Sequence, residues 1–185
     1  MSFGDAVNPI TPAGFAELRA RYDRLLGSER PKIVEVVSWA AGNGDRSENG
    51  DYIYGRKRLR EIDRELSHLS RRMKAARVLD PAMQEDRTRA FFGASVEIAD
   101  EHDMRLAITL VGDDEQDASV GRIGWSSPMA RGLRGAAVGD LRRVRLPGGE
   151  KEWQVMTITY HAINHPVAPA KAGPQPACEP EAAVS

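Results

Sequence analysis

Apolar side chains recur every three or four positions through the first eighty residues, which is the spacing of a stripe along one face of a helix. The stripe starts after Thr11-Pro12, a favourable N-cap followed by proline at the first helical position. Gly27 and Pro31 interrupt it, and we expect them to bend the first helix. The apolar residues of this helix are Phe15, Leu18, Tyr22, Leu25, Ile33, Val36, Val37 and Ala40.

A second stripe follows a turn-forming segment at residues 41–44. It is a heptad repeat and predicts a helix from about Ser47 to Leu79, with one face formed by Tyr52, Gly55, Leu59, Ile62, Leu66, Leu69, Met73 and Ala76. Two long striped helices joined by a short turn bury their stripes on each other, so residues 1–80 are predicted to form an antiparallel coiled-coil hairpin. Residues 43–49 would form its tip.

Three residues near the turn receive separate interpretations. Tyr52 opens the second stripe and is interpreted as structural. Trp39 lies off the main stripe, where it can be exposed, but core packing is the interpretation we prefer. Gly55, inside the second stripe, is expected to be a weak point of the helix.

Beyond Asp80-Pro81, which ends the second helix, the apolar period changes to two. Strands are predicted at about 95–98, 104–111, 120–125, 141–146 and 153–160. Ser127-Pro128 predicts a short helix through Leu133. The chain is therefore predicted to be α+β, with a polar linker at 81–92 and a small antiparallel-sheet domain at 93–160. The Pro/Ala-rich residues 161–185 are expected to be a disordered tail.

The composition agrees with a modest folded domain beside an exposed helical element, since 29% of the residues are charged and only 6% are aromatic. A single cysteine, Cys178, excludes a disulfide framework. Residues 1–12 lack the pattern of a signal peptide, and no apolar stretch approaches the length of a membrane span. We expect a cytoplasmic monomer with no membrane partner.

The formal net charge of −1 hides a basic stretch on the second helix, because residues 43–79 contain ten basic and six acidic side chains. The basic residues closest to the tip are Arg56, Lys57, Arg58 and Arg60, and the set continues with Arg64, Arg71, Arg72, Lys74 and Arg77. Such a cluster indicates contact with RNA phosphates or an acidic channel wall. The alternative is a solvated flank paired with Glu17, Asp23 and Glu35 of the first helix. For the cluster near the tip we favour the contact.

Two carboxylates at the tip, those of Asp45 and Glu48, are three residues apart and therefore share one helix face. They also match a capping box, with Asp45 as the N-cap, and on the local pattern alone this structural role is favoured. Two carboxylates in water hold Mg²⁺ weakly. Beside another protein's metal ion and a phosphodiester they can complete a two-metal site. The two roles are compatible.

Several short segments together form a pattern far more specific than any one of them. They are Gly44-Asp45-Arg46-Ser47-Glu48-Asn49, Asp51-Tyr52, Lys57-Arg58-Leu59-Arg60-Glu61-Ile62-Asp63, Phe91-Phe92-Gly93-Ala94, Val96-Glu97-Ile98, Ser127-Pro128-Met129-Ala130-Arg131 and Val138-Gly139-Asp140. With these segments the chain resembles the bacterial Gre transcript cleavage factors, most closely the GreB type, over about residues 10–160. Gly50 departs from the family pattern and is expected to weaken the second helix by up to about 1 kcal/mol.

The resemblance implies a coiled coil that enters the secondary channel of bacterial RNA polymerase. It also implies a domain similar to FKBP-type folds that docks at the channel rim through Ser127, Pro128 and Met129. Asp45 and Glu48 would share a second Mg²⁺ with the polymerase, and the basic cluster would contact the RNA 3′ segment of a backtracked transcript. The polymerase would cut, so this protein would not be an enzyme. Alternatives are a channel-binding regulator without cleavage and a plain coiled-coil adaptor.

Overall fold

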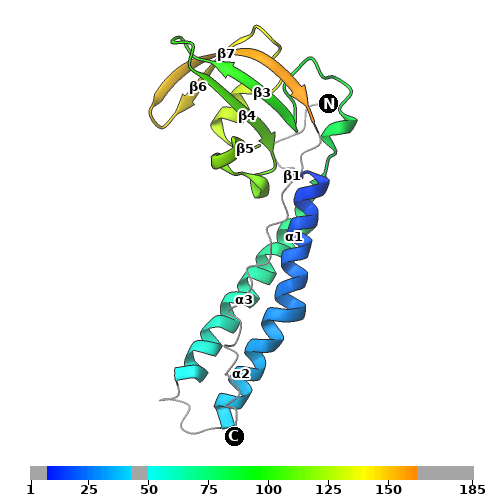
Figure 1. Ribbon diagram of the computed structural model, residues 1–185, viewed down its shortest axis with the longest axis vertical. Helices are drawn as coiled ribbons and strands as arrows, with labels where there is room; N and C mark the ends of the chain where they lie inside the picture. Colours follow the sequence, from blue (N-terminus) through cyan, green and yellow to red (C-terminus); the bar gives the residue numbers. More distant parts are fainter. Residues whose placement is uncertain (1–7, 43–49, 162–185) are drawn as a thin grey trace, which may run out of the picture.

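The computed structural model describes residues 8–42 and 50–161, which form a long helical hairpin and a sheet domain at one of its ends (Figure 1). The hairpin comprises β1 Asn8–Ile10, α1 Pro12–Arg24, a π-helical segment Leu25–Glu29, α2 Arg30–Gly42, α3 Gly50–Ala75 and β2 Ala76–Val78. The sheet domain comprises β3 Ala94–Ala99, β4 Arg105–Val111, β5 Arg122–Gly124, α4 Pro128–Leu133, β6 Leu141–Leu146 and β7 Gly149–Tyr160. This arrangement confirms the predicted α+β fold.

The first arm of the hairpin is helical without a break from Pro12 to Gly42. The Thr11 side chain accepts a hydrogen bond from the Gly14 N–H at 3.0 Å, as expected of an N-cap. Pro31 has no N–H to donate to the carbonyl four residues earlier, and the helix adapts by winding as a π-helix over Leu25–Glu29. The disturbance predicted at Gly27 and Pro31 is therefore a local change of winding, not an interruption.

The two arms pack against each other along the predicted stripes. Buried residues of both arms form the centre of the seam, and partly buried residues flank it: Leu25, Ile62, Leu66 and Leu69, with Leu18, Tyr22 and Ile33. A Cβ atom added to Gly55 would lie 2.4 Å from Val37 Cγ2. The expected weak point at Gly55 is thus a close contact between the arms. Val36, predicted in the seam, is 46% exposed, because it is rotated by about 100° from Val37, which holds the seam position.

The second arm ends at Ala75, before the predicted end at Leu79, because the chain continues as β2. This strand pairs in parallel with β1, and the Leu79 N–H donates to the Ile10 carbonyl at 2.9 Å. The prediction missed both strands, since three residues are too few for a period-two pattern and their partners are remote in sequence. The small sheet joins the beginning and the end of the hairpin at its base.

The sheet of the second domain has the strand order β5-β4-β3-β7-β6. The pairs β3–β4, β3–β7 and β6–β7 are antiparallel, but β5 lies parallel to β4. The sheet is therefore mixed, and the prediction of a wholly antiparallel sheet was wrong. The connection from β4 to β5 contains two 3₁₀ turns, Asp113–Glu115 and Ala118–Val120, which alternation of apolar residues does not reveal.

The core of this domain includes residues that the sequence assigned to a linker. Ala90 and Phe92 are buried in it. The Tyr160 hydroxyl accepts a hydrogen bond from the Phe91 N–H at 2.9 Å and donates one to the Arg89 carbonyl at 2.6 Å. Burial raises the pKa of Tyr160. The end of the predicted linker is consequently part of the sheet domain, and the Tyr160 hydroxyl of β7 connects it to the last strand.

Gly55→Ala is expected to destabilise the hairpin, although alanine is the better helix former. The new methyl group would meet Val37, whose branched side chain has little rotamer freedom to move away. We expect the free energy of unfolding to fall by about 1–3 kcal/mol, measured by thermal denaturation followed by far-ultraviolet circular dichroism.

Gly50→Ala is the matched control for this change. Among the described residues, nothing lies within 4 Å of a Cβ at Gly50, so the substitution should stabilise α3 by up to about 1 kcal/mol. Adding Val37→Ala to Gly55→Ala should relieve the contact. A Gly55→Ala protein more stable than the unsubstituted chain would contradict close packing of the arms.

Candidate functional site

The segment that carries Asp45 and Glu48 lies between the end of α2 at Gly42 and the start of α3 at Gly50. These two helix ends lie at the end of the hairpin opposite the sheet domain (Figure 1). With 26 residues, α3 is about 39 Å long. Asp45 and Glu48 themselves lie outside the described residues, so their roles as cap and as metal ligands stay predictions.

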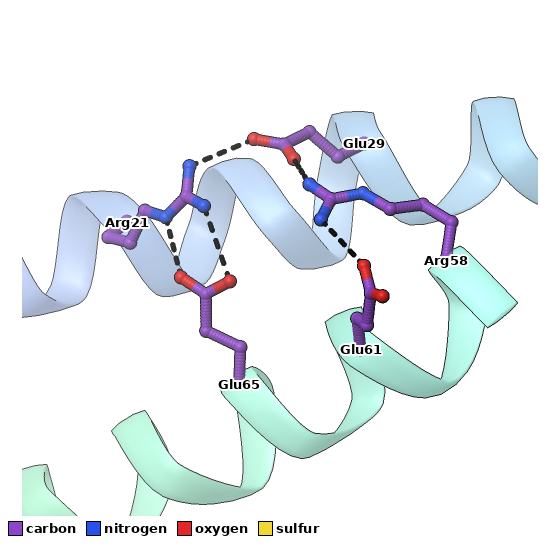
Figure 2. A network of polar contacts seen from close by, with 5 residues as sticks. All are labelled: Arg21, Glu29, Arg58, Glu61 and Glu65. Carbon is purple, nitrogen blue, oxygen red and sulfur yellow. Dashed lines mark hydrogen bonds and ion pairs between the residues drawn. The ribbon is translucent and has the colours of Figure 1, made fainter.

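Arg58, one of the predicted contact residues, belongs to a network of ion pairs between the two arms (Figure 2). Its guanidinium donates to Glu29 at 3.3 Å and to Glu61 at 3.2 Å. Glu29 also accepts from Arg21 at 3.0 Å, and Arg21 donates to both oxygens of Glu65 at 2.8 and 3.3 Å. The hydrogen bond to Glu65 raises the pKa of Arg21. Arg58 therefore holds the arms together.

The other three basic residues near the tip lie differently. The Arg56 guanidinium carbon is 5.7 Å from the centre of the Tyr52 ring, within range of a cation–π contact. Lys57 and Arg60 are exposed, and in the described ranges 8–42 and 50–161 neither side chain has an ion-pair or hydrogen-bond partner. Of the four basic residues near the tip, Arg58 thus connects the two arms. The other three face solvent.

Arg72, at the base of α3, connects the hairpin to the sheet domain. Its Nε atom lies 2.7 and 2.9 Å from the two carboxylate oxygens of Asp114. A terminal nitrogen donates to Asn8 Oδ1 at 3.0 Å, and the Asn8 amide donates to Asp114 at 3.2 Å. The Asp114 side chain is only 13% exposed. The sequence analysis counted Arg72 among the basic residues available for contact with RNA or a channel wall. In the structure Arg72 instead pairs with Asp114 of the sheet domain.

Glu115 makes a second connection at the same place. It is a buried carboxylate, 5% exposed, and it accepts the Thr11 N–H at 3.0 Å and the Gly112 N–H at 3.1 Å. The Thr11 hydroxyl donates to its other oxygen. Thr11 thus caps α1 and holds the sheet domain at once. Gly14 leaves space for the Glu115 carboxylate, because a Cβ atom at Gly14 would lie 2.3 Å from Glu115 Oε1.

We call this set of residues the joint: Asn8, Thr11, Arg72, Asp114 and Glu115. Sequence reasoning missed it, because residues 113–117 read only as a polar loop and the partners are far apart in the chain. The one available signal was Thr11, whose capping role was recognised without its second partner.

The three predicted docking residues lie at the start of α4. The Ser127 side chain accepts the Ala130 N–H at 3.2 Å, as the predicted N-cap. Pro128 is exposed, whereas Met129 packs partly buried against the domain core. Ser127 and Met129 therefore shape α4, and Pro128 presents its surface to solvent. Docking through these residues stays a prediction.

The predicted metal ligands are the tip acids, which lie outside the described residues. Within residues 8–42 and 50–161, no group of three or more His, Cys, Asp or Glu side chains is placed to hold a metal ion. No helix in the same part of the chain is both long and apolar enough to cross a membrane. The predicted shared Mg²⁺ rests on Asp45 and Glu48, which offer the oxygen ligands that this ion prefers.

Two protein-family models match the chain, and together they span most of it. The model for the N-terminal part of a transcription elongation factor, GreA_GreB_N, matches residues 8–78. The model for the C-terminal part of the transcription elongation factors GreA/GreB matches residues 84–160. The boundary between the two matches falls just after β2, where the hairpin meets the sheet domain.

Curated relatives align along nearly their whole length. Transcription elongation factor GreB of Neisseria meningitidis serogroup B is 44% identical over 157 residues, which cover 85% of this chain and 96% of the relative. The protein of the same name from Pseudomonas aeruginosa is 43% identical over 153 residues, covering 82% and 89%. Among solved structures, GreA factor homolog 1 of Thermus thermophilus is 21% identical and covers 83% of this chain and 99% of that one, with a TM-score of 0.39.

Arg72→Ala is expected to loosen the joint. It removes the charge-assisted hydrogen bonds to a carboxylate that is largely shielded from water. The free energy of unfolding should fall by about 1–3 kcal/mol, as determined by denaturant titration.

The neighbouring Arg71→Ala serves as the control for charge and helix propensity. Arg71 is exposed and has no hydrogen-bond or ion-pair partner among the described residues, so its loss should change stability by less than about 0.5 kcal/mol. Equal effects of the two substitutions would show that the Arg72–Asp114 contact contributes nothing.

Proposed function

The chain belongs to the GreA/GreB family of transcription elongation factors, and from this premise we propose that it stimulates the cleavage of backtracked RNA by bacterial RNA polymerase itself. Its hairpin enters the secondary channel of the polymerase and brings Asp45 and Glu48 to the polymerase active site. The polymerase makes the cut, and the factor has no catalytic site of its own.

The observation that carries the proposal is the position of Gly42 and Gly50, the two helix ends that residues 43–49 connect in the chain. Both lie at the end of the hairpin opposite the sheet domain (Figure 1). A narrow, stiff pair of helices is the element that can enter a channel while the wider domain stays outside. The seam, the Gly55–Val37 contact and the ion pairs of Figure 2 keep the arms together.

The chemistry follows from the residue types at the tip. Asp45 and Glu48 each supply a carboxylate, and two carboxylates favour sharing a metal ion over holding one alone. When bound between the two proteins, a Mg²⁺ ion supplies stabilisation of negative charge at the scissile phosphate. The acids hold this ion and orient water. Arg56, Lys57 and Arg60 face solvent along the same arm, where they can contact the phosphates of the RNA 3′ segment.

The sheet domain docks at the rim of the channel, and Ser127, Pro128 and Met129 are the candidate contacts. The joint then transmits the position of the docked domain to the hairpin. Because Arg72 and Glu115 fix the hairpin to the domain by hydrogen bonds in sites shielded from water, docking at one end determines where the other end lies.

Asp45→Asn combined with Glu48→Gln is the direct test. Asparagine caps a helix as well as aspartate, and glutamine serves in a capping box, so the fold should be kept while metal sharing is lost. With purified polymerase halted in a backtracked complex and labelled RNA, we expect the unsubstituted chain to shorten the transcript and the double variant to lose that stimulation.

Competition for polymerase binding is the control, and the double variant should compete as the unsubstituted chain does. If the unsubstituted chain binds polymerase without shortening the RNA, it is a channel-binding regulator and the cleavage proposal fails. If it does not bind polymerase at all, an adaptor role remains.

Arg58 and Arg60 should separate stability from RNA contact. Arg58→Ala removes the guanidinium that donates to both Glu29 and Glu61, so it should lower the melting temperature. Arg60→Ala should leave the melting temperature unchanged. At subsaturating concentrations of the factor it should slow cleavage by about threefold to tenfold, and a tenfold loss corresponds to about 1.4 kcal/mol of binding free energy. The opposite pattern, with Arg60 needed for stability and Arg58 alone for cleavage, would overturn the assignment.

A further inference from the structure

Two large aromatic side chains near the tip end of the hairpin are exposed to solvent. Trp39 on α2 is 66% exposed and Tyr54 on α3 is 75% exposed. The expectation that Trp39 packs in the core was wrong, because its neighbour Ala40 is the fully buried residue at that turn. Single exposed apolar side chains are common, but large apolar side chains that lie near one another at the surface can mark a site that a partner covers.

The two rings lie on the same flank of the hairpin. In an antiparallel helix pair, the positions directly before seam residues on both arms face the same side. The network of Figure 2 demonstrates this geometry: Arg21 directly precedes seam residue Tyr22, Glu65 directly precedes Leu66, and the two side chains meet. Trp39 directly precedes Ala40, and Tyr54 directly precedes Gly55. Both therefore share the flank of the network.

The rings also lie at the same height along the hairpin. The close approach of Gly55 to Val37 aligns these two residues across the seam. Trp39 is two residues beyond Val37 towards the tip, about 3 Å, and Tyr54 is one residue beyond Gly55 in the same direction, about 1.5 Å. Same flank and same height put the two residues on neighbouring arms at one level of the hairpin.

The charges around the rings indicate what covers them. Lys57 and Arg58 follow Tyr54 by three and four residues, so they flank it on the helix surface. Arg58 is engaged with Glu29 and Glu61, but Lys57 is exposed, with no hydrogen-bond or ion-pair partner in the described part of the chain. Aromatic faces beside a free cation match single-stranded nucleic acid, whose bases stack and whose phosphates take the cation.

We propose that Trp39 and Tyr54 form an aromatic platform that stacks on unpaired bases of the extruded RNA 3′ segment, with Lys57 beside its phosphates. This proposal rests on the proposed function, because that function brings the RNA 3′ segment to this end of the hairpin. Since every base has a stacking face, the platform binds RNA without a fixed sequence. It holds the strand while the tip acids meet the scissile phosphate.

Photocross-linking tests the contact directly. RNA carrying 5-iodouridine near its 3′ end is assembled with polymerase in a backtracked complex, the factor is added, and cross-linked peptides are identified by mass spectrometry. The expected cross-links are to Trp39 or Tyr54. Trp39→Leu combined with Tyr54→Leu should abolish them, and Ile53→Ala, a change at another exposed apolar residue of α3, should not. Cross-links that persist in the double leucine variant would overturn the platform.

Cleavage kinetics give a second readout. With the double leucine variant, the polymerase should cleave the RNA about tenfold more slowly. Trp39→Phe combined with Tyr54→Phe, which keeps two stacking faces, should retain most of the stimulated rate. Binding to polymerase that is not backtracked should be unchanged in both. Weaker binding there would mean that the rings contact the polymerase and would overturn the RNA assignment.

The two proposals fail in distinguishable ways. If the unsubstituted chain stimulates cleavage and the double leucine variant cross-links and stimulates cleavage to the same extent, the platform is wrong and the function stands. If the unsubstituted chain does not stimulate cleavage but still cross-links through Trp39 or Tyr54, the function is wrong and the platform stands. Melting curves of the leucine variant should match the unsubstituted chain, since both rings are exposed.

Discussion

The hydrogen bonds that Glu115 accepts from Thr11 fix the direction in which the hairpin leaves the sheet domain. A carboxylate shielded from water is tolerated only where donors surround it. Here the donors are the Gly112 N–H and, from the hairpin, the N–H and hydroxyl of Thr11, which caps α1. Rotation of the hairpin would break both bonds from Thr11 together. Over an arm of about 39 Å, a rotation of about 10° moves the far end by about 7 Å, more than a shared metal ion tolerates.

Stiffness along the hairpin matters as much as its direction at the base. The arms approach closely where Gly55 meets Val37, and they are bridged nearer the base by Arg58, Glu29 and Arg21. Each exposed ion pair contributes little by itself, but the five side chains of Figure 2 form one connected network between the arms. The network resists sliding of one arm past the other. The apolar seam by itself resists such sliding less.

The hairpin and most strands were predictable from sequence because each is encoded by a local period. The joint was not, because its contacts connect residues that are 42 to 106 positions apart, and nothing local distinguishes Glu115 from other acids of its loop. The strand at β5 was predicted, but its parallel pairing with β4 was not, and the pair β1–β2 was missed for the same reason. Within the site, residue type predicted the cluster from Arg56 to Arg60, but only the register across the seam shows that Arg58 bridges the arms and Arg60 does not.

That register also explains why the basic residues of α3 differ, since some pair with the first arm and others face solvent. Positions directly before seam residues of α3 meet the first arm on the flank of Figure 2, where Arg58 finds Glu29. Arg56 directly follows Gly55, and Arg60 directly follows Leu59, so both face the opposite flank. There Asp63 pairs with Arg30 at 2.9 Å, one turn farther from the tip than Arg60. The paired flank holds the arms in register and carries the exposed rings. On the opposite flank, Arg56 and Arg60 have no ion-pair partner among the described residues, and they lie near the end that bears the acids.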